Sequence, residues 1–138
     1  MGTEENKKTV RRYIEEILNN LDYAHAKEIV HEGFFGQGLG ISSLEEHEKY
    51  FKAQREQIPD IKTTLEETIA EGDKVVAICT NSFTDTAGNF GNPPSNKLLS
   101  FRTIIIYTLK DGRIVKGEPL SDVLTAIRQT GATTINLS

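Results

Sequence analysis

Residues 98–124, LLSFRTIIIYTLKDGRIVKGEPLSDVL, hold the longest β-branched and aromatic run of the chain and one tight turn. Because such residues fit the pleated surface of a sheet, we predict a strand over residues 101–109. The Asp111-Gly112 pair favours a short hairpin turn, after which a second antiparallel strand runs over residues 113–120. Alternation along that second strand predicts that one side carries Ile114, Lys116, Glu118, Leu120 and Asp122.

The segments before this hairpin read as helices and then strands. Apolar residues recur at helical spacing over residues 5–21, and Ser42 or Ser43 begins another helix that Pro59 stops near residue 58. Between them we expect a helix capped by Asp22 and ending at Gly33, then a glycine-interrupted loop over residues 33–40. Strands are predicted over residues 61–69 and 74–84, and a short helix over residues 122–129.

This order predicts the fold class. Consecutive strands joined by turns favour an antiparallel, meander-like sheet, and helices gathered at one end of the chain cover one sheet face in an α+β arrangement. We expect one domain over residues 1–138, in which a curved sheet curls around the N-terminal helices to form a cone. A pocket in the open end of that cone is the expected binding site.

Composition excludes several classes of function. The net charge of -4 and the dispersed basic residues argue against nucleic acid, and no apolar run approaches the ~20 residues of a membrane span. The N-terminal residues lack the apolar core of a signal peptide, and the lone Cys79 cannot form an internal disulfide, so we expect a cytoplasmic protein. No cluster of residues has metal-ligand spacing, and we expect neither a metal nor a cofactor.

Several short segments together carry a family resemblance. They are Asn19-Asn20-Leu21-Asp22, Ile58-Pro59-Asp60, Ala70 to Val76 (AEGDKVV), Gly91 to Ser95 (GNPPS), Tyr107 to Val115 (YTLKDGRIV), Asp122 and Gln129-Thr130-Gly131. In this order they resemble the SnoaL-like polyketide cyclases of the nuclear-transport-factor-2-like superfamily. The resemblance implies the same cone-shaped fold and a cofactor-free cyclase whose general acid/base is an aspartate, for which Asp122 is the matching position.

The resemblance also leaves gaps. The family often has Glu-His-Trp after the Ile-Val of the last strand, where this chain has Lys116-Gly117-Glu118 and no tryptophan anywhere. The histidine of the cyclase site has no match. Asp122 also stands where a helix N-cap belongs, so it is either the proton-transferring carboxylate or only a cap.

Other candidate pocket residues follow from the helix and strand faces. His47, Phe51 and Gln54 share a face of the third helix, and a lone histidine there is either a ligand contact or satisfied at the helix rim. Polar or aromatic groups on other elements complete the expected substrate site. They are Tyr13 on the first helix, Cys79 and Asn81 on one strand face, and Glu118 before Pro119. We expect His47, Phe51, Gln54, Cys79 and Asp122 to surround one cavity.

Three functions fit these residues. The first is a SnoaL-like enzyme acting on an apolar or polyketide-like carbonyl compound by general acid/base chemistry; the second is a small-ligand-binding or dimerisation module that has lost catalysis; the third is an isomerase or hydrolase. We also expect a homodimer formed through the outer sheet face, because that face mixes apolar and polar residues. The apolar ones are Val76, Ile78, Ile104 and Ile106, among Thr80, Ser82, Ser100 and Arg102.

Overall fold

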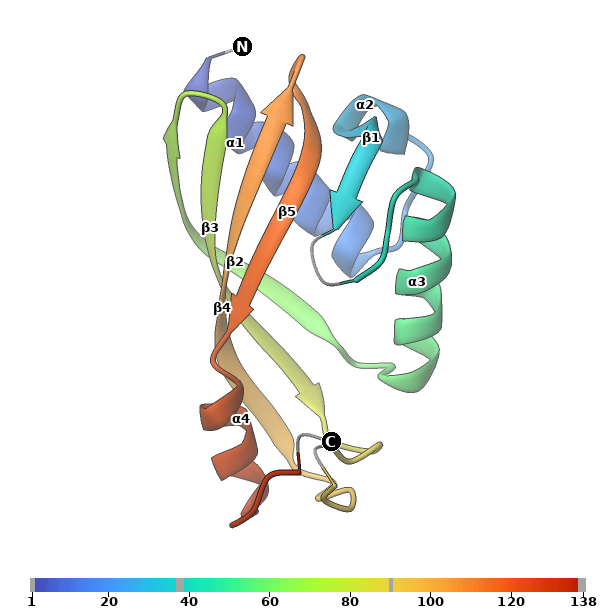
Figure 1. Cartoon of the computed structure of the whole chain (residues 1–138), viewed down its shortest axis with the longest axis vertical. Helices are drawn as coiled ribbons and strands as arrows, with labels where there is room; N and C mark the ends of the chain where they lie inside the picture. Colours follow the sequence, from blue (N-terminus) through green and yellow to red (C-terminus); the bar gives the residue numbers. More distant parts are fainter. Residues whose placement is uncertain (1, 37–38, 90, 137–138) are drawn as a thin grey trace.

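The computed structural model describes residues 2–36, 39–89 and 91–136. Most helices precede the long strands in the chain, and the last helix follows them (Figure 1). The elements in chain order are α1 (Thr3–Arg12), η1 (Tyr13–Asn19), α2 (Ala26–Ile29), β1 (Val30–Gly36), α3 (Leu44–Gln57), β2 (Lys62–Glu71), β3 (Lys74–Thr84), β4 (Leu98–Lys110), β5 (Arg113–Ser121) and α4 (Val123–Thr130).

The first and third predicted helices are confirmed. α1 continues directly into η1, whose seven residues wind as a π-helix, and Val10, Ile14 and Ile17 along their inner side are fully buried. α3 begins where the sequence predicts, since Ser43 accepts a hydrogen bond from the backbone of Glu46 at 3.1 Å. Both helices therefore form because their local sequence supports them and their apolar side meets the sheet.

The sheet has the strand order β1-β5-β4-β3-β2. All neighbouring strands are antiparallel except β1, which runs parallel to β5. The hairpin between β4 and β5 turns at Asp111 and Gly112, whose φ angles of 53° and 74° suit a two-residue turn of the kind that the sequence predicts. The class is α+β, with a mixed and open sheet.

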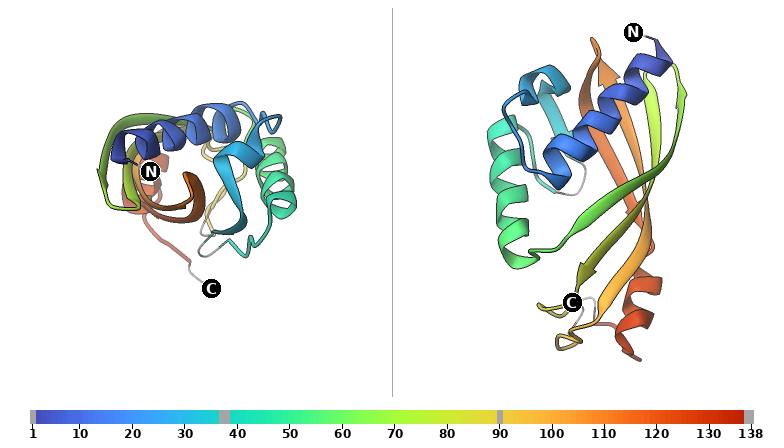
Figure 2. Two further views of the ribbon diagram at one scale, coloured as in Figure 1. Left: turned by 90° about the horizontal axis from the view of Figure 1, so that it is seen from above. Right: turned by 180° about the vertical axis from the view of Figure 1, so that it is seen from behind.

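Strong curvature gives the sheet a concave and a convex face. α1 and η1 lie across the concave face, and α3 lies beside β1 at the open side (Figure 2). Alternate residues of the central strands point into this concave side and form the core with the helices. The fully buried ones include Val75 and Cys79 on β3 and Ile114 on β5. The helices thus cover the concave face, as predicted.

The region between the first and third helices differs from the prediction. The second helix is short and ends at Ile29, because Val30 already has extended backbone, with φ of -110° and ψ of 127°. β1 then occupies much of the predicted loop, although residues 37 and 38 of that loop lie outside the described part of the chain. Its glycines, Gly33 and Gly36, hide the strand pattern, and long-range pairing with β5 stabilises it.

Two irregularities in strand pairing change which side chains face inward. The register of β2 shifts between Leu65 and Glu67, so Ile69 points outward and is 53% exposed, although the sequence put it on the side of Leu65. A second shift lies between Thr108, which pairs with Lys116, and Leu109, which pairs with Ile114. Because of it, Ile114 and Gly117 face inward together, whereas alternation predicts opposite sides.

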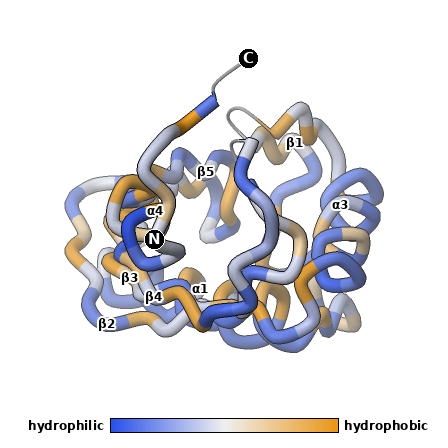
Figure 3. Tube along the Cα trace, turned by 90° about the horizontal axis from the view of Figure 1, so that it is seen from below, coloured by the Kyte–Doolittle hydropathy of each residue, from blue (hydrophilic) through white to orange (hydrophobic). Residues whose placement is uncertain are grey.

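Hydrophobic residues are unevenly spread over the helices. α4 carries several, while α3 is mostly hydrophilic (Figure 3). In the described ranges, no helix combines the length and apolar character that crossing a membrane requires.

Candidate active site

A cavity of about 210 Å³ opens between the concave sheet face, η1, β1 and α3. Its walls are mainly apolar and come from all these elements. The apolar wall residues are Leu18, Phe34, Leu39, Phe51, Ile61, Ile105 and Pro119. Apolar walls with few polar groups are typical of small-molecule sites. A cavity with such walls therefore lies on the concave side of the sheet.

One polar row crosses the floor of this cavity on four neighbouring strands. Thr63 donates to Asn81 at 2.6 Å, Asn81 donates to Thr103 at 2.6 Å, and Thr103 and Ser121 share a hydrogen bond of 2.8 Å. Since Thr103 already accepts a hydrogen bond from Asn81, its own hydroxyl hydrogen is available to Ser121. The Ser121 hydroxyl can then donate to a ligand. We call Thr63, Asn81, Thr103 and Ser121 the polar ladder.

A second polar feature lies in the helical wall. The Tyr13 hydroxyl lies 2.6 Å from Nε2 of His47, and the Tyr23 hydroxyl lies 2.9 Å from Nδ1 of the same ring. Tyr13 lines the cavity, and His47 behind it is fully buried. The ring of His47 also packs against Phe34 and Phe51, with centroids 5.2 and 4.5 Å away. Both ring nitrogens of a buried histidine are therefore bonded to tyrosines.

Burial sets the protonation of these groups. Removal from water lowers the pKa of His47 from 6.5 to about 4, and the nearby Glu48 opposes this only in part. The ring is therefore neutral at pH 7, with one N–H donor and one acceptor nitrogen. Burial also raises the pKa of Tyr13 far above its usual value of 10, so its hydroxyl stays protonated. The site thus offers neutral hydrogen-bonding groups.

Tyr107 on β4 is another tyrosine of the cavity wall. Its ring meets that of Tyr13 edge to face at a centroid distance of 5.4 Å, and the residue is 2% exposed. Burial raises its pKa well above 10. Gly117 lies against this ring, because a Cβ there would stand 3.2 Å from Cε1 of Tyr107. A glycine at this position leaves space for the tyrosine.

Four of the residues predicted for the pocket line the cavity: Tyr13, Phe51, Gln54 and Asn81. Both ring nitrogens of His47 are hydrogen-bonded to tyrosine hydroxyls, and not to the backbone or water at a helix rim. His47 reaches the cavity through Tyr13. Cys79 is fully buried in the core beneath the cavity, where burial raises the pKa of its thiol to about 11. Its thiol is a packing group in this position.

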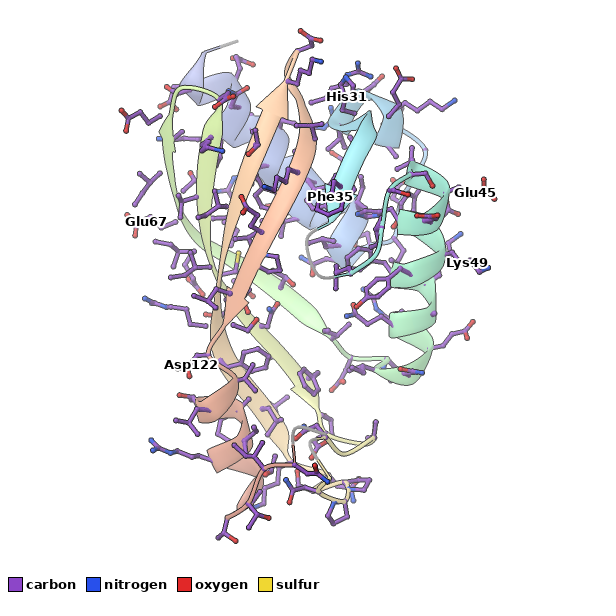
Figure 4. All side chains as sticks on the ribbon, in the orientation of Figure 1. His31, Phe35, Glu45, Lys49, Glu67 and Asp122 are labelled. Atoms are coloured by element: carbon purple, nitrogen blue, oxygen red, sulfur yellow. The ribbon has the colours of Figure 1, made fainter. Side chains whose placement is uncertain are left out.

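Asp122 and Glu118 lie outside the cavity, so the prediction that Asp122 borders it is wrong. Asp122 is the N-cap of α4 and accepts hydrogen bonds from the backbone and hydroxyl of Thr125, at 3.2 and 2.6 Å. Those bonds lower the pKa of its carboxyl. Figure 4 shows Asp122 on the side of the sheet away from α3. Its catalytic role stays a prediction, without a contact to the cavity.

Glu118 faces outward because of the shifted register of β5. It stands opposite Ile106 on the convex face, and its carboxylate lies 3.5 Å from the ammonium of Lys116. The sequence correctly puts Glu118 and Asp122 on one side of β5, but that side is the outer one. Glu118 is therefore no part of the pocket.

Several residues of the site carry no signal of their own in the sequence. Four of them lie on the inward side of their strands, but only the pairing of the strands brings them together. They are Thr63, Thr103, Tyr107 and Ser121. Tyr23 lacks such a signal because it lies in the connection before α2. A search for polar residues on the apolar side of each strand would have found the polar ladder. Among the described residues, no group of three or more histidine, cysteine or acidic side chains could hold a metal.

The fold and site define a class of protein: a cone-shaped α+β domain with a mainly apolar cavity on its concave face. The sequence profile of the SnoaL-like polyketide cyclases matches residues 8–130. The chain therefore belongs to the SnoaL-like polyketide cyclase family. No curated protein matches it.

Solved structures agree with this fold. TsrD from Streptomyces laurentii superposes with a TM-score of 0.79 at 22% identity, over 96% of this chain and 98% of that chain. A SnoaL-like polyketide cyclase from Agrobacterium tumefaciens gives a TM-score of 0.78 at 17% identity, over 96% and 100%. At such identities the likeness shows the fold alone.

Proposed function

We propose that the protein is a small-molecule enzyme that uses no cofactor and performs general acid/base chemistry on an apolar carbonyl compound. The reaction is an aldol-type ring closure or a related isomerisation. One observation carries the proposal: the Tyr13 hydroxyl stands at the wall of an apolar cavity, held 2.6 Å from a buried neutral His47. A fixed donor in a dry site stabilises negative charge on oxygen far better than water does.

The chemistry follows from what Tyr13 can do. A ligand carbonyl oxygen beside this hydroxyl accepts a hydrogen bond, which strengthens as the carbonyl becomes an enolate or an alkoxide. The polar ladder offers a second point of attachment through the Ser121 hydroxyl. Two such contacts, one on the helical wall and one on the sheet, would fix the orientation of a ligand with two oxygen atoms.

The cavity walls limit the size and the chemistry of the substrate. The cavity has about the volume of seven water molecules at ~30 Å³ each, which suits one or two rings with the remainder outside the mouth. None of the described residues that line it has an ionised side chain at pH 7. A strong base is therefore missing from the lining, and the substrate must itself be easily enolised. A 1,3-dicarbonyl compound meets that demand.

A 1,3-dicarbonyl compound tethered to a ketone tests this function. Its closure to a six-membered ring is followed by absorbance, and the product is separated on a chiral column. We expect the wild-type protein to accelerate closure and give one enantiomer in excess, and Tyr13→Phe to slow closure about 100-fold. Thr64→Ala, on the outward side of β2 next to Thr63, is the matched control. A racemic product formed equally fast without protein would refute the proposal.

The alternative is a ligand-binding module without catalysis. The observation in its favour is the neutral lining, because hydrogen-bonding and apolar groups suffice for binding. It predicts that the same diketone binds, as measured by calorimetry, and is released unchanged.

Asp122 as the acid/base remains a separate hypothesis. A cytoplasmic location likewise stays a prediction from the sequence.

We also propose a homodimer formed through the convex sheet face. The pairing of β2 to β5 joins apolar side chains into one patch there, with Ile69 53% and Leu120 77% exposed. The patch consists of Ile69, Val76, Ile78, Ile104, Ile106 and Leu120. A second copy of the chain would remove this surface from water. An exposed apolar face that a second copy can cover supports a two-fold dimer.

A further inference from the structure

His47 joins the cavity to the outer surface through two tyrosines from different parts of the chain. Tyr13, in η1, lines the cavity, while Tyr23, before α2, lines a separate surface groove with Leu44 and Glu48. The hydroxyls bind opposite nitrogens of the ring, at 2.6 and 2.9 Å. The three side chains therefore form one unbroken hydrogen-bonded path between two solvent-accessible spaces.

A neutral imidazole gives this path two allowed states. In the first, Tyr13 donates to Nε2 and Nδ1–H donates to Tyr23. In the second, Tyr23 donates to Nδ1, Nε2–H donates to Tyr13, and the Tyr13 hydroxyl donates into the cavity. The observed distances favour the first state at rest, since O–H donors give shorter bonds than N–H donors. A ligand oxygen in the cavity favours the second.

We propose that Tyr13, His47 and Tyr23 form a proton relay that carries a proton between the outer groove and the ligand. The relay rests on the proposed function, because it needs a ligand oxygen that gains or loses a proton. In the inward direction, Tyr13 O–H gives its proton to the alkoxide or enolate oxygen and takes one from Nε2. Nδ1 takes the Tyr23 proton, and Tyr23 is reprotonated by solvent water or buffer acid. Each group loses one proton and gains one, so the relay itself ends neutral.

The surroundings of the path favour a proton transfer in which every group of the relay stays uncharged. Phe34 and Phe51 flank the buried ring, which disfavours an imidazolium ion there. At the outer end, Glu48 lines the groove with Tyr23, and the Lys52 ammonium lies 6.0 Å from the centre of the Tyr23 ring. Charged groups therefore lie near the end that exchanges protons with solvent, whereas none of the described residues that line the cavity is charged. His47 and Tyr23 are positioning residues in this scheme, since neither touches the ligand.

The tautomer of His47 can be measured without a substrate. In protein with ¹⁵N-labelled histidine at about pH 8, where exposed histidines are neutral, the two ring nitrogens report which one carries hydrogen. We expect the Nδ1–H form in the wild type and a population shifted toward Nε2–H in Tyr23→Phe, which removes the acceptor of Nδ1–H. His31 is an internal reference, because its Nδ1 accepts from the backbone of Gly33 at 2.9 Å.

Matched variants distinguish an effect of the hydrogen bonds between the tyrosines and His47 from a general effect on packing. Tyr50→Phe removes another hydroxyl at the cavity wall that makes no hydrogen bond to His47, so it should leave the tautomer unchanged. Tyr13→Phe removes the acceptor of Nε2–H, so it should keep the Nδ1–H form but move the resonance of the unprotonated Nε2, which loses its hydrogen bond from Tyr13. This shift keeps the test open if Tyr23→Phe fails to fold. A tautomer that is the same in the wild type and Tyr23→Phe would overturn the relay, and so would an Nε2 resonance unchanged in Tyr13→Phe or a cationic ring.

Ring closure of the tethered diketone then separates the relay from the function that it serves. We expect Tyr23→Phe to lower kcat about 10-fold with KM unchanged, because a positioned proton-transfer group contributes ~100-fold or more and Tyr23 supports it only indirectly. Loss of activity in Tyr13→Phe with full activity in Tyr23→Phe would overturn the relay and leave the proposed function intact. Full activity in both variants would overturn the proposed function itself.

Discussion

Burial of a neutral His47 makes the stability of the fold depend on pH. The pKa of this ring is about 4 in the folded chain and 6.5 in an exposed histidine. Between these values the unfolded chain binds a proton that the folded chain does not, so stability rises with pH. This contribution is fully present above pH 6.5 and is lost as the pH falls toward 4. His47→Gln, which cannot titrate, should lack it.

The size of the effect follows from the two pKa values. A difference of about 2.5 corresponds to about 3 kcal/mol at 1.36 kcal/mol per pKa unit, of which about 2 kcal/mol are lost by about pH 5. Urea unfolding at about pH 8 and about pH 5 measures it in both proteins. Carboxylates such as Asp60, whose pKa is lowered by bonds to Thr84, titrate in both and cancel in the comparison. Equal losses of stability in wild type and variant would refute a buried neutral ring.

Three further predictions concern Asp122, the convex face and the polar ladder. Asp122→Asn keeps an oxygen for Thr125, so melting should barely change; turnover of the diketone should fall about 100-fold if the carboxylate transfers protons and stay unchanged if it only caps α4. Leu120→Lys should convert a dimer into a monomer in sedimentation, with Glu45→Lys on α3 as control, and a monomeric wild type would contradict the dimer. Thr103→Val should cost about 1–3 kcal/mol in urea unfolding, because Asn81 and Ser121 lose a buried partner; an unchanged stability would argue against the ladder.

The sequence by itself determined the elements with strong local patterns. Apolar residues at helical spacing predict α1 with η1 and α3, and the Asp111-Gly112 pair predicts the hairpin of β4 and β5. Strict alternation on β3 correctly put Cys79 and Asn81 on the inner face. These features depend on residues close in sequence, and their order also carried the family resemblance that the profile confirms.

Only the tertiary structure decided the make-up of the site. The two register shifts reversed the faces of Ile69 and Glu118, because a bulge depends on the partner strand as well as on the strand's own sequence. β1 exists through its pairing with β5, and its glycines conceal it in the sequence. Tyr13 and His47 are 34 residues apart, and their contact requires η1 and α3 to be packed around the same concave face. Long-range pairing therefore selected which predicted residues meet in the cavity and excluded Asp122 from it.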